Sequence, residues 1–241
     1  MTEPARSFDL AAEEYERTRP GYPPELLDSL PLDADASVLD LGAGTGKLTR
    51  VLVGRYAHVT AVEPLERMRA ILERVVPKAQ ALAGSAERIP LDDASVDGVF
   101  AAQAFHWFDH DLALPEIARV LRPGGVLCLV WNGPDEARAS PLPKAFLAYL
   151  DELRASAEFH GQPSWVEVIA RGPFGETHEQ TVPHDHVLDR PGLIDNARSV
   201  SWIASRPDEE REAVLAKLDS LLEDGTYAIP NLAHALWAVR E

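Results

Sequence analysis

Short apolar runs in this chain alternate with amphipathic segments, and the alternation predicts its architecture. Between residues 38 and 131, runs typical of buried strands are followed by stretches with apolar residues at helical spacing. The predicted strands cover 38–41, 58–62, 79–83, 97–102 and 126–131, and the predicted helices cover 47–55, 65–76 and 112–121. Strands that alternate with helices form a parallel sheet with helices on both faces and right-handed crossovers. The pattern therefore predicts a doubly wound α/β fold.

The two ends of the chain have less regular patterns. Residues 1–37 are expected to form an N-terminal arm, with a short helix around Phe8, Ala11, Ala12 and Tyr15. Further helices are expected at 24–30, 143–157, 164–170, 191–204 and 208–223, β structure at 177–188 and a last strand at 233–240. We interpret residues 1–241 as a single domain in which the segment from about 134 to 205 forms a helical cap.

The run VLDLGAGTGKLT, residues 38–49, joins the first predicted strand to the first predicted helix through Gly42, Gly44 and Gly46. Glycine is needed where the backbone takes positive φ or approaches a ligand closely. The unpaired N–H groups of a first helical turn attract an anionic group. The sequence therefore predicts that a small molecule binds at this turn.

The glycine spacing separates three kinds of ligand for such a turn. A dinucleotide fingerprint requires G-x-G-x-x-G, but Lys47 occupies the place of its third glycine. A Walker loop requires G-x-x-x-x-G-K-[ST], but Leu41 and Leu48 occupy its glycine and hydroxyl positions. The remaining pattern, Asp-Leu-Gly-x-Gly-x-Gly, is weak alone and becomes specific only together with segments at fixed distances later in the chain.

The composition of the chain limits the classes of molecule that it is expected to bind. The 39 acidic and 23 basic residues give a net charge of −16, which argues against a nucleic-acid footprint and fits a small-molecule substrate. The single cysteine, Cys128, lies in an apolar run and is expected to be a buried core thiol. No signal peptide and no apolar stretch long enough for a membrane span is visible, so we expect a cytoplasmic protein.

Five segments, taken together and in order, resemble the class I S-adenosylmethionine-dependent methyltransferases. They are the glycine turn, the Glu63-Pro64 end of the second strand, GSAERIPL at 84–91, QAFHWFD at 103–109 and RPGGVL at 122–127. The opening FDLAAEEYERTRPGYP and the QAFHWFD segment are similar to the type-11 methyltransferase domain, a group that includes enzymes similar to trans-aconitate methyltransferase. The resemblance implies a mostly parallel, seven-stranded Rossmann-like sheet, S-adenosylmethionine as cofactor and S-adenosylhomocysteine as product.

The resemblance also implies roles for single residues. Glu63 can accept two hydrogen bonds from a ribose diol, although the ribose of a nicotinamide cofactor would be held in the same way. Ala86 and Glu87 are expected to read the adenine edge, and Tyr15 and Arg19 are candidates for the methionine carboxylate. The implied cofactor-binding residues are Tyr15, Arg19, Asp40, Gly42, Ala43, Gly44, Gly46, Glu63, Pro64, Met68, Ala86, Glu87, Gln103 and Phe105.

The candidate for acceptor chemistry is His106, because a histidine titrates near neutrality and can remove a proton from an acceptor. His106 could equally hold its turn by a hydrogen bond, while Trp107 and Phe108 are expected to pack in the core. We assign no metal ligands. The expected reaction is methyl transfer to an oxygen, nitrogen or carbon of a small-molecule acceptor, in a monomer or homodimer. A cofactor-binding sensor or scaffold, and a nicotinamide-dependent oxidoreductase, remain as alternatives.

Overall fold

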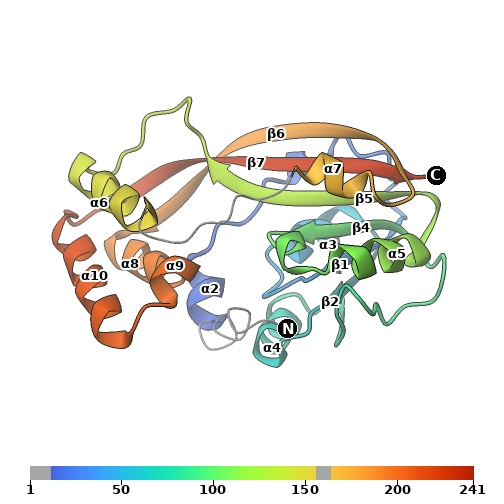
Figure 1. Ribbon diagram of the computed structural model, residues 1–241, viewed down its shortest axis with the longest axis horizontal. Helices are drawn as coiled ribbons and strands as arrows, with labels where there is room; N and C mark the ends of the chain where they lie inside the picture. Colours follow the sequence, from blue (N-terminus) through green and yellow to red (C-terminus); the bar gives the residue numbers. More distant parts are fainter. Residues whose placement is uncertain (1–11, 156–163) are drawn as a thin grey trace. The chain divides into compact units, whose positions relative to one another are not determined.

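The computed structural model describes residues 12–155 and 164–241. Seven strands in these ranges form one β-sheet. Its strands are β1 Ser37–Leu41, β2 His58–Val62, β3 Gln80–Leu82, β4 Val96–Ala102, β5 Leu121–Pro134, β6 Phe174–Asp189 and β7 Thr226–Arg240. Their order across the sheet is β3-β2-β1-β4-β5-β7-β6. Figure 1 labels β1, β2 and β4 to β7 together with the α-helices. The expected helix positions Phe8 and Ala11 lie outside the described residues.

The first five strands pair in parallel, as the alternating pattern predicts. β1 lies between β2 and β4, β3 pairs with β2, and β5 pairs with β4. Parallel pairing brings the carboxyl ends of β1, β2 and β4 to one edge of the sheet, and ligands of open α/β sheets bind outside that edge. The doubly wound α/β fold is therefore confirmed.

The chain divides into two compact units. The described residues of the first, which we call the helical unit, are 12–20, 134–155 and 183–231; those of the second, the sheet unit, are 21–133, 164–182 and 232–241. The helices of the sheet unit are η1 Pro24–Leu27, α3 Thr49–Arg55, α4 Glu66–Val75, η2 Phe105–Trp107, α5 His110–Val120 and α7 Trp165–Ile169. The helices of the helical unit are α2 Ala12–Thr18, α6 Lys144–Ala155, α8 Arg190–Arg198, α9 Ser201–Ala204 and α10 Asp208–Ser220.

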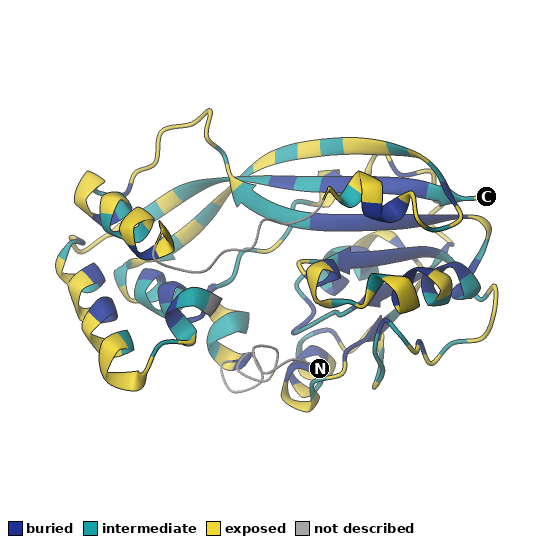
Figure 2. Cartoon of the chain, viewed as in Figure 1, coloured by how far each residue is buried: buried dark blue, intermediate teal, exposed yellow. Residues whose placement is uncertain are grey.

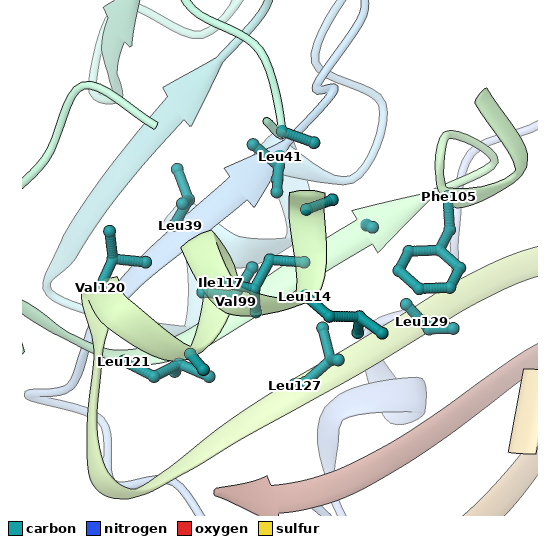
Figure 3. Packing of buried hydrophobic residues seen from close by; sticks show 14 of the residues in the cluster. Leu39, Leu41, Val99, Phe105, Leu114, Ile117, Val120, Leu121, Leu127 and Leu129 are labelled. Atoms are coloured by element: carbon teal, nitrogen blue, oxygen red, sulfur yellow. The ribbon is translucent and has the colours of Figure 1, made fainter. Parts of the chain in front are cut away.

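Alternate residues of the central strands enter two different apolar clusters. Leu39 of β1 and Leu127 of β5 lie in a cluster with Ile117 of α5, as Figure 3 shows. The neighbouring strand residue Val38 lies in a second cluster with Leu52 of α3. Successive side chains of a strand point to opposite faces, so helices cover the sheet on both sides. Complete burial of a side chain such as Ile117 contributes about 2–3 kcal/mol. Figure 2 shows β4 and β5 largely buried.

Cys128 belongs to the second of these clusters and is fully buried. Burial raises the pKa of its thiol, because the thiolate is poorly solvated there. The expectation of a buried core thiol is confirmed.

Several element boundaries differ from the predicted ones. The helix after the glycine turn, α3, begins at Thr49 rather than at residue 47, because the turn continues through residue 48. The Arg-Pro-Gly-Gly segment ends α5 as predicted, but it also belongs to the first part of β5. The pairing of β5 with β4 is irregular there, since Val96 pairs with Leu121 and the next pair is Gly98 with Val126. The helix expected at 191–204 is divided into α8 and α9.

The helical unit has its own apolar core and includes the N-terminal helix α2. Buried residues of its four other helices meet in one cluster: Phe146, Leu193, Ile203, Leu215 and Leu218. Residues at the end of α2 are attached to α8: Arg17 forms a 2.6 Å ion pair with Asp195, and Asn196 Nδ2 donates to the Thr18 carbonyl over 3.0 Å. No helix in the described ranges has the length and apolar character needed to cross a membrane.

Candidate functional site

The turn after β1 takes the backbone conformation that its glycines predict. Gly42, Gly44 and Gly46 have φ values of 71°, 57° and 87°, in the left-handed region that favours glycine. The N–H groups of Gly42 and Ala43 both donate to the Val62 carbonyl, over 2.8 and 3.1 Å. These bonds fix the turn against the end of β2.

The three glycines differ in what a side chain would meet. A Cβ on Gly42 would lie 2.7 Å from the Ala104 Cβ, and a Cβ on Gly46 would lie 3.0 Å from Val76 Cγ2. Packing therefore excludes a side chain at Gly42 and leaves little room for one at Gly46. A Cβ on Gly44 would meet nothing within 4 Å, so the backbone at Gly44 faces open space that a ligand can approach.

The Glu63 side chain at the end of β2 is only 5% exposed, which excludes an ordinary solvated surface charge. Its Oε2 accepts a 2.8 Å hydrogen bond from the Gly44 N–H, and its Oε1 accepts a 2.9 Å bond from the Leu65 N–H. Arg69 Nη1 donates to the Glu63 carbonyl over 2.8 Å. The carboxylate is thus held directly beside the glycine turn.

Asp40 is completely buried below the same turn. Burial raises the pKa of its carboxyl to about 7; the Thr49 hydroxyl, which donates to Oδ2 over 2.6 Å, opposes this shift, and the nearby charge of Glu63 adds to it. Asp40 Oδ1 and Thr45 Oγ1 are buried without a hydrogen-bond partner among the described residues. Buried polar atoms of this kind beside the open face of Gly44 fit a polar small molecule bound at the turn.

The segment after β3 contains the predicted adenine-reading pair. Ala86 is 3% exposed, and Glu87 Oε1 accepts a 3.0 Å hydrogen bond from the Asp109 N–H. Burial works to raise the pKa of Glu87, but hydrogen bonds from the Asp109 backbone and the Ser85 side chain outweigh it, so the pKa is lowered. Glu87 therefore stays ionised near neutral pH.

Gln103 follows β4 and adopts a φ of 52°, which is uncommon for a residue other than glycine. Its N–H donates to the Val130 carbonyl and its Nε2 to the Asn132 carbonyl, over 2.9 and 3.1 Å. Such a conformation persists only where its surroundings hold it, and here two bonds to β5 do so.

The aromatic turn after β4 divides between the core and the surface. Phe105 is buried with its ring 5.3 Å from that of Trp165 and 5.7 Å from that of Phe108. Phe108 is partly buried against the same cluster, as expected. The expectation for Trp107 is wrong: its side chain is 40% exposed, because the short helix η2 turns it away from the cluster that holds Phe105.

His106 is exposed at this turn, with its ring centroid 4.8 Å from that of Trp107. Partial desolvation lowers its pKa, and repulsion from His110 lowers it further, so the neutral ring that can accept a proton is favoured. The hydrogen bond that closes the turn involves another ring, since His110 Nε2 lies 3.0 Å from the Phe105 carbonyl oxygen.

The remaining predicted residues lie in two places. Pro64 is exposed beside Glu63, and Met68 of α4 is 3% exposed. Tyr15 and Arg19 belong to the helical unit, where the Arg19 guanidinium carbon lies 5.5 Å from the Tyr15 ring centre and Nη2 donates to the Ser199 carbonyl. Contact of these residues with the cofactor stays a prediction.

Sequence reasoning missed Thr49, which supports Asp40, and the pair Glu116 and Arg119, which holds the segment after β3. The i,i+3 spacing of Glu116 and Arg119 on an amphipathic helix was the only available signal for that pair. Their contacts with residues 89–93 join parts of the chain too distant for any local pattern to show.

A glycine turn after β1 and a buried acidic residue at the end of β2 define the class of nucleotide- and nucleoside-binding α/β proteins. Comparison with known proteins narrows the class. A family described as a methyltransferase domain matches residues 39–129. An uncharacterized methyltransferase of Mycobacterium tuberculosis is 44% identical over 216 residues, covering 90% of this chain and 85% of that protein. A trans-aconitate 2-methyltransferase of Azoarcus is 32% identical, covering 78% of this chain and 74% of that enzyme.

A solved structure of a proposed Type II methyltransferase from Anaeromyxobacter dehalogenans has a TM-score of 0.61 and 26% sequence identity, covering 92% of this chain and 96% of that one. The chain therefore belongs to the S-adenosylmethionine-dependent methyltransferases, and S-adenosylmethionine is its cofactor.

Proposed function

We propose that the chain transfers the methyl group to a small-molecule acceptor at the carboxyl ends of β1, β2 and β4. The observation that carries the location is the hydrogen bond from the Gly44 N–H to the buried carboxylate of Glu63. It joins the two features that an adenosyl ligand needs, a glycine backbone open to close approach and a fixed acceptor for ribose hydroxyls.

Each part of this site has a separate task in the proposal. The backbone from Gly42 to Gly46 lies along the amino-acid half of the cofactor, and Glu63 accepts from the ribose hydroxyls. Two hydrogen bonds already orient the Glu63 carboxylate, so little side-chain entropy is lost when it binds the sugar. Ala86 and Glu87 read the adenine edge.

When bound, the cofactor supplies a methyl group already activated by its sulfonium. The chain then has to supply position and exclusion of water. A turn held by hydrogen bonds to β2, together with the buried Glu63, is suited to that task because both are fixed before the ligand arrives.

His106 is the proposed base for acceptors that must lose a proton. Its lowered pKa keeps the ring neutral near pH 7, so that it can take the proton of a hydroxyl, an amine or an acidic carbon. A carboxylate acceptor has no proton to lose and needs no base. The relative named trans-aconitate 2-methyltransferase supports including small carboxylates among the acceptors to be tried.

Calorimetric titration with S-adenosylhomocysteine, beside NADH as the competing ligand, tests the proposed cofactor site. Saturable heat with the first and none with the second is expected. Methyl release to a panel of acids, phenols and amines then tests transfer. Cofactor binding without turnover on any class would favour a sensor, and binding of NADH alone would contradict the proposal.

A further inference from the structure

We propose that Arg119 and Glu116 of α5 are positioning residues for the adenosine half of the cofactor, because they fix the segment that follows Ala86 and Glu87. This inference rests on the proposed function, in which those two residues read the adenine. Neither Arg119 nor Glu116 is placed in contact with the cofactor. They act through the backbone between residues 89 and 93.

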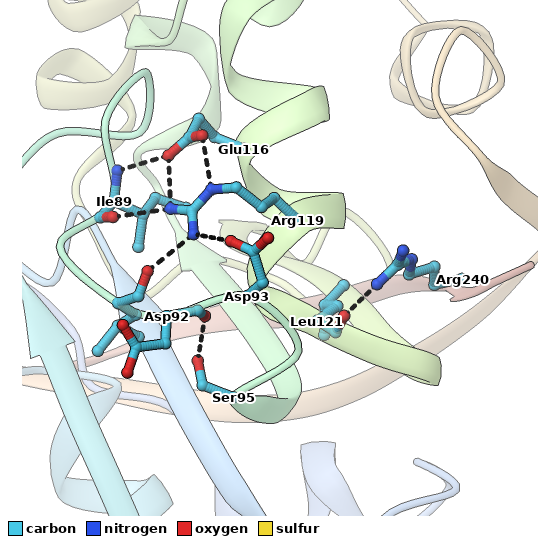
Figure 4. Close-up of polar contacts among 9 residues, drawn as sticks. Ile89, Asp92, Asp93, Ser95, Glu116, Arg119, Leu121 and Arg240 are labelled. Atoms are coloured by element: carbon cyan, nitrogen blue, oxygen red, sulfur yellow. Dashed lines mark hydrogen bonds and ion pairs between the residues drawn. The ribbon is translucent and has the colours of Figure 1, made fainter.

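The guanidinium of Arg119 is the centre of the contacts in Figure 4. Nη2 donates to the Ile89 carbonyl over 3.0 Å, and Nη1 donates to the Leu91 carbonyl over 2.8 Å and to Asp93 Oδ1 over 2.7 Å. The Arg119 side chain thus binds three alternate residues of one segment. Its planar fork of donors fixes the path of that segment in a way that a single ammonium group could not.

Glu116 completes the attachment from the other side of the guanidinium. Its Oε1 and Oε2 accept from Arg119 Nε and Nη2, over 2.8 and 2.9 Å, and Oε2 also accepts from the Ile89 N–H over 3.0 Å. Both backbone polar groups of Ile89 are therefore bonded to this pair. The Ile89 side chain is 3% exposed and anchors the segment in the core.

A second attachment lies at the other end of α5. Asp109, the residue before the helix, donates its N–H to Glu87 Oε1, while Arg119 lies near the carboxyl end of the helix. The helix therefore holds the segment at Glu87 and again from Ile89 to Asp93. A rigid helix with two attachments can define where the backbone beside Ala86 lies.

The Arg119–Glu116 pair contributes both to stability and, in this proposal, to position. Its side chains are 30% and 24% exposed and its contact is bidentate, so its loss should cost a modest part of the folding free energy. Misplacement of a binding segment is costlier, since a shift of about 1 Å can reduce function by up to about a hundredfold. Loss of the pair should therefore weaken ligand binding in variants that remain folded.

Titration with two probes distinguishes an effect on binding of the adenosine half of the cofactor from an effect on binding of its amino-acid half. S-adenosylhomocysteine carries both halves of the cofactor, and 5′-methylthioadenosine lacks the amino-acid half. Arg119→Lys keeps the charge but loses the fork, and Glu116→Gln keeps the shape but loses the charge. Each variant should raise the dissociation constants of both probes by the same factor, about tenfold. The KM for S-adenosylmethionine should rise with kcat unchanged.

The matched control is Arg190→Met, which removes another Arg–carboxylate pair, the bonds of Arg190 to Asp219 in the helical unit. It should leave both dissociation constants unchanged. Amide hydrogen exchange of the ligand-free protein adds a direct readout, because the Ile89 amide should exchange faster in Glu116→Gln. This measurement also shows whether each variant is folded.

Two outcomes overturn the inference while leaving the proposed function intact. One is wild-type binding of both probes with unchanged constants in folded Arg119→Lys and Glu116→Gln. The other is weakened S-adenosylhomocysteine with unchanged 5′-methylthioadenosine. A wild-type protein that binds neither probe would refute the proposed function, and the inference with it.

Discussion

Glu63 Oε2 lies 2.8 Å from the Gly44 nitrogen and accepts its hydrogen bond, so that the end of β2 is fixed to the turn after β1. Gly44 and Glu63 come from separate βα connections, and parallel pairing of β1 with β2 brings them together. The bond holds the Glu63 carboxylate, the proposed acceptor for the ribose hydroxyls, beside the open face of Gly44. Substitutions at its members and their neighbours should therefore separate binding from stability.

Replacing Glu63 by Gln should weaken binding of S-adenosylhomocysteine. The amide keeps the size of the side chain but presents only one acceptor oxygen, and a hydrogen bond to a charged group is worth about 1.5–3 kcal/mol. The dissociation constant should rise by at least about tenfold. Calorimetric titration measures it, with the exposed Glu66 of α4 replaced by Gln as control. An unchanged constant would remove Glu63 from the site.

Alanine at Gly44 and at Gly42 should have different effects. Gly44→Ala meets no atom within 4 Å, so its cost to folding is the positive φ, about 1–2 kcal/mol, while its methyl group should enter the space proposed for the ligand. Gly42→Ala places the new Cβ 2.7 Å from that of Ala104 and should lower the melting temperature more. Thermal unfolding and titration of both variants check the contrast. Equal loss of stability with retained binding in Gly44→Ala would contradict it.

The backbone conformation of the glycine turn could be predicted from the sequence, but the packing around it could not. Three glycines after an apolar run predict positive φ, and the structure shows positive φ at all three positions. The sequence could not show that packing crowds Gly42 and Gly46 while Gly44 faces open space, because Ala104 and Val76 come from distant parts of the chain.

Strand and helix positions followed the local patterns closely. The strand predicted at 58–62 is β2, which has the predicted bounds His58–Val62. The irregularity around Gly124 in β5 was not predicted, because the register with β4 decides it. The same limit applies to Arg119, whose carbonyl partners lie far from it in the chain. The attachment of Arg17 to Asp195 likewise joins segments that no local pattern connects.

Asp40 should make the stability of the protein depend on pH. Burial raises the pKa of its carboxyl to about 7 in the folded chain, whereas an unfolded Asp titrates near 3.9. Between about pH 3.9 and about pH 7, the folded protein keeps a proton on Asp40 that the unfolded chain has lost. The stability that this proton gives is present at low pH and is lost as the pH rises through about 7. Asp40→Asn removes the effect.

Urea unfolding of the wild type and Asp40→Asn measures this difference. As the pH rises from about 5 to about 8, the wild type should lose roughly 3 kcal/mol of unfolding free energy that Asp40→Asn does not lose. Thr49→Val, which removes the donor to Asp40 Oδ2, should raise the Asp40 pKa further and shift the loss of stability to higher pH. A difference between wild type and Asp40→Asn that does not change with pH would contradict the account.

His106→Gln should lower kcat on an acceptor that loses a proton and leave cofactor affinity unchanged. General-base catalysis contributes about a hundredfold to ten-thousandfold. Because desolvation lowers the His106 pKa, the rising limb of the wild-type pH–rate profile should have its midpoint below about 6.5, and the variant should lack that limb. His110→Gln is the control for general disruption of the turn, since His110 bonds the Phe105 carbonyl. Full activity in His106→Gln would assign His106 no part in the chemistry.

A crystal structure of the complex with S-adenosylhomocysteine decides whether the glycine turn and Glu63 hold the cofactor. The amino-acid half of the ligand should lie along residues 42–46, with both ribose hydroxyls within hydrogen-bond distance of the Glu63 carboxylate. A ligand bound elsewhere, or a sugar that makes no contact with Glu63, would contradict this assignment.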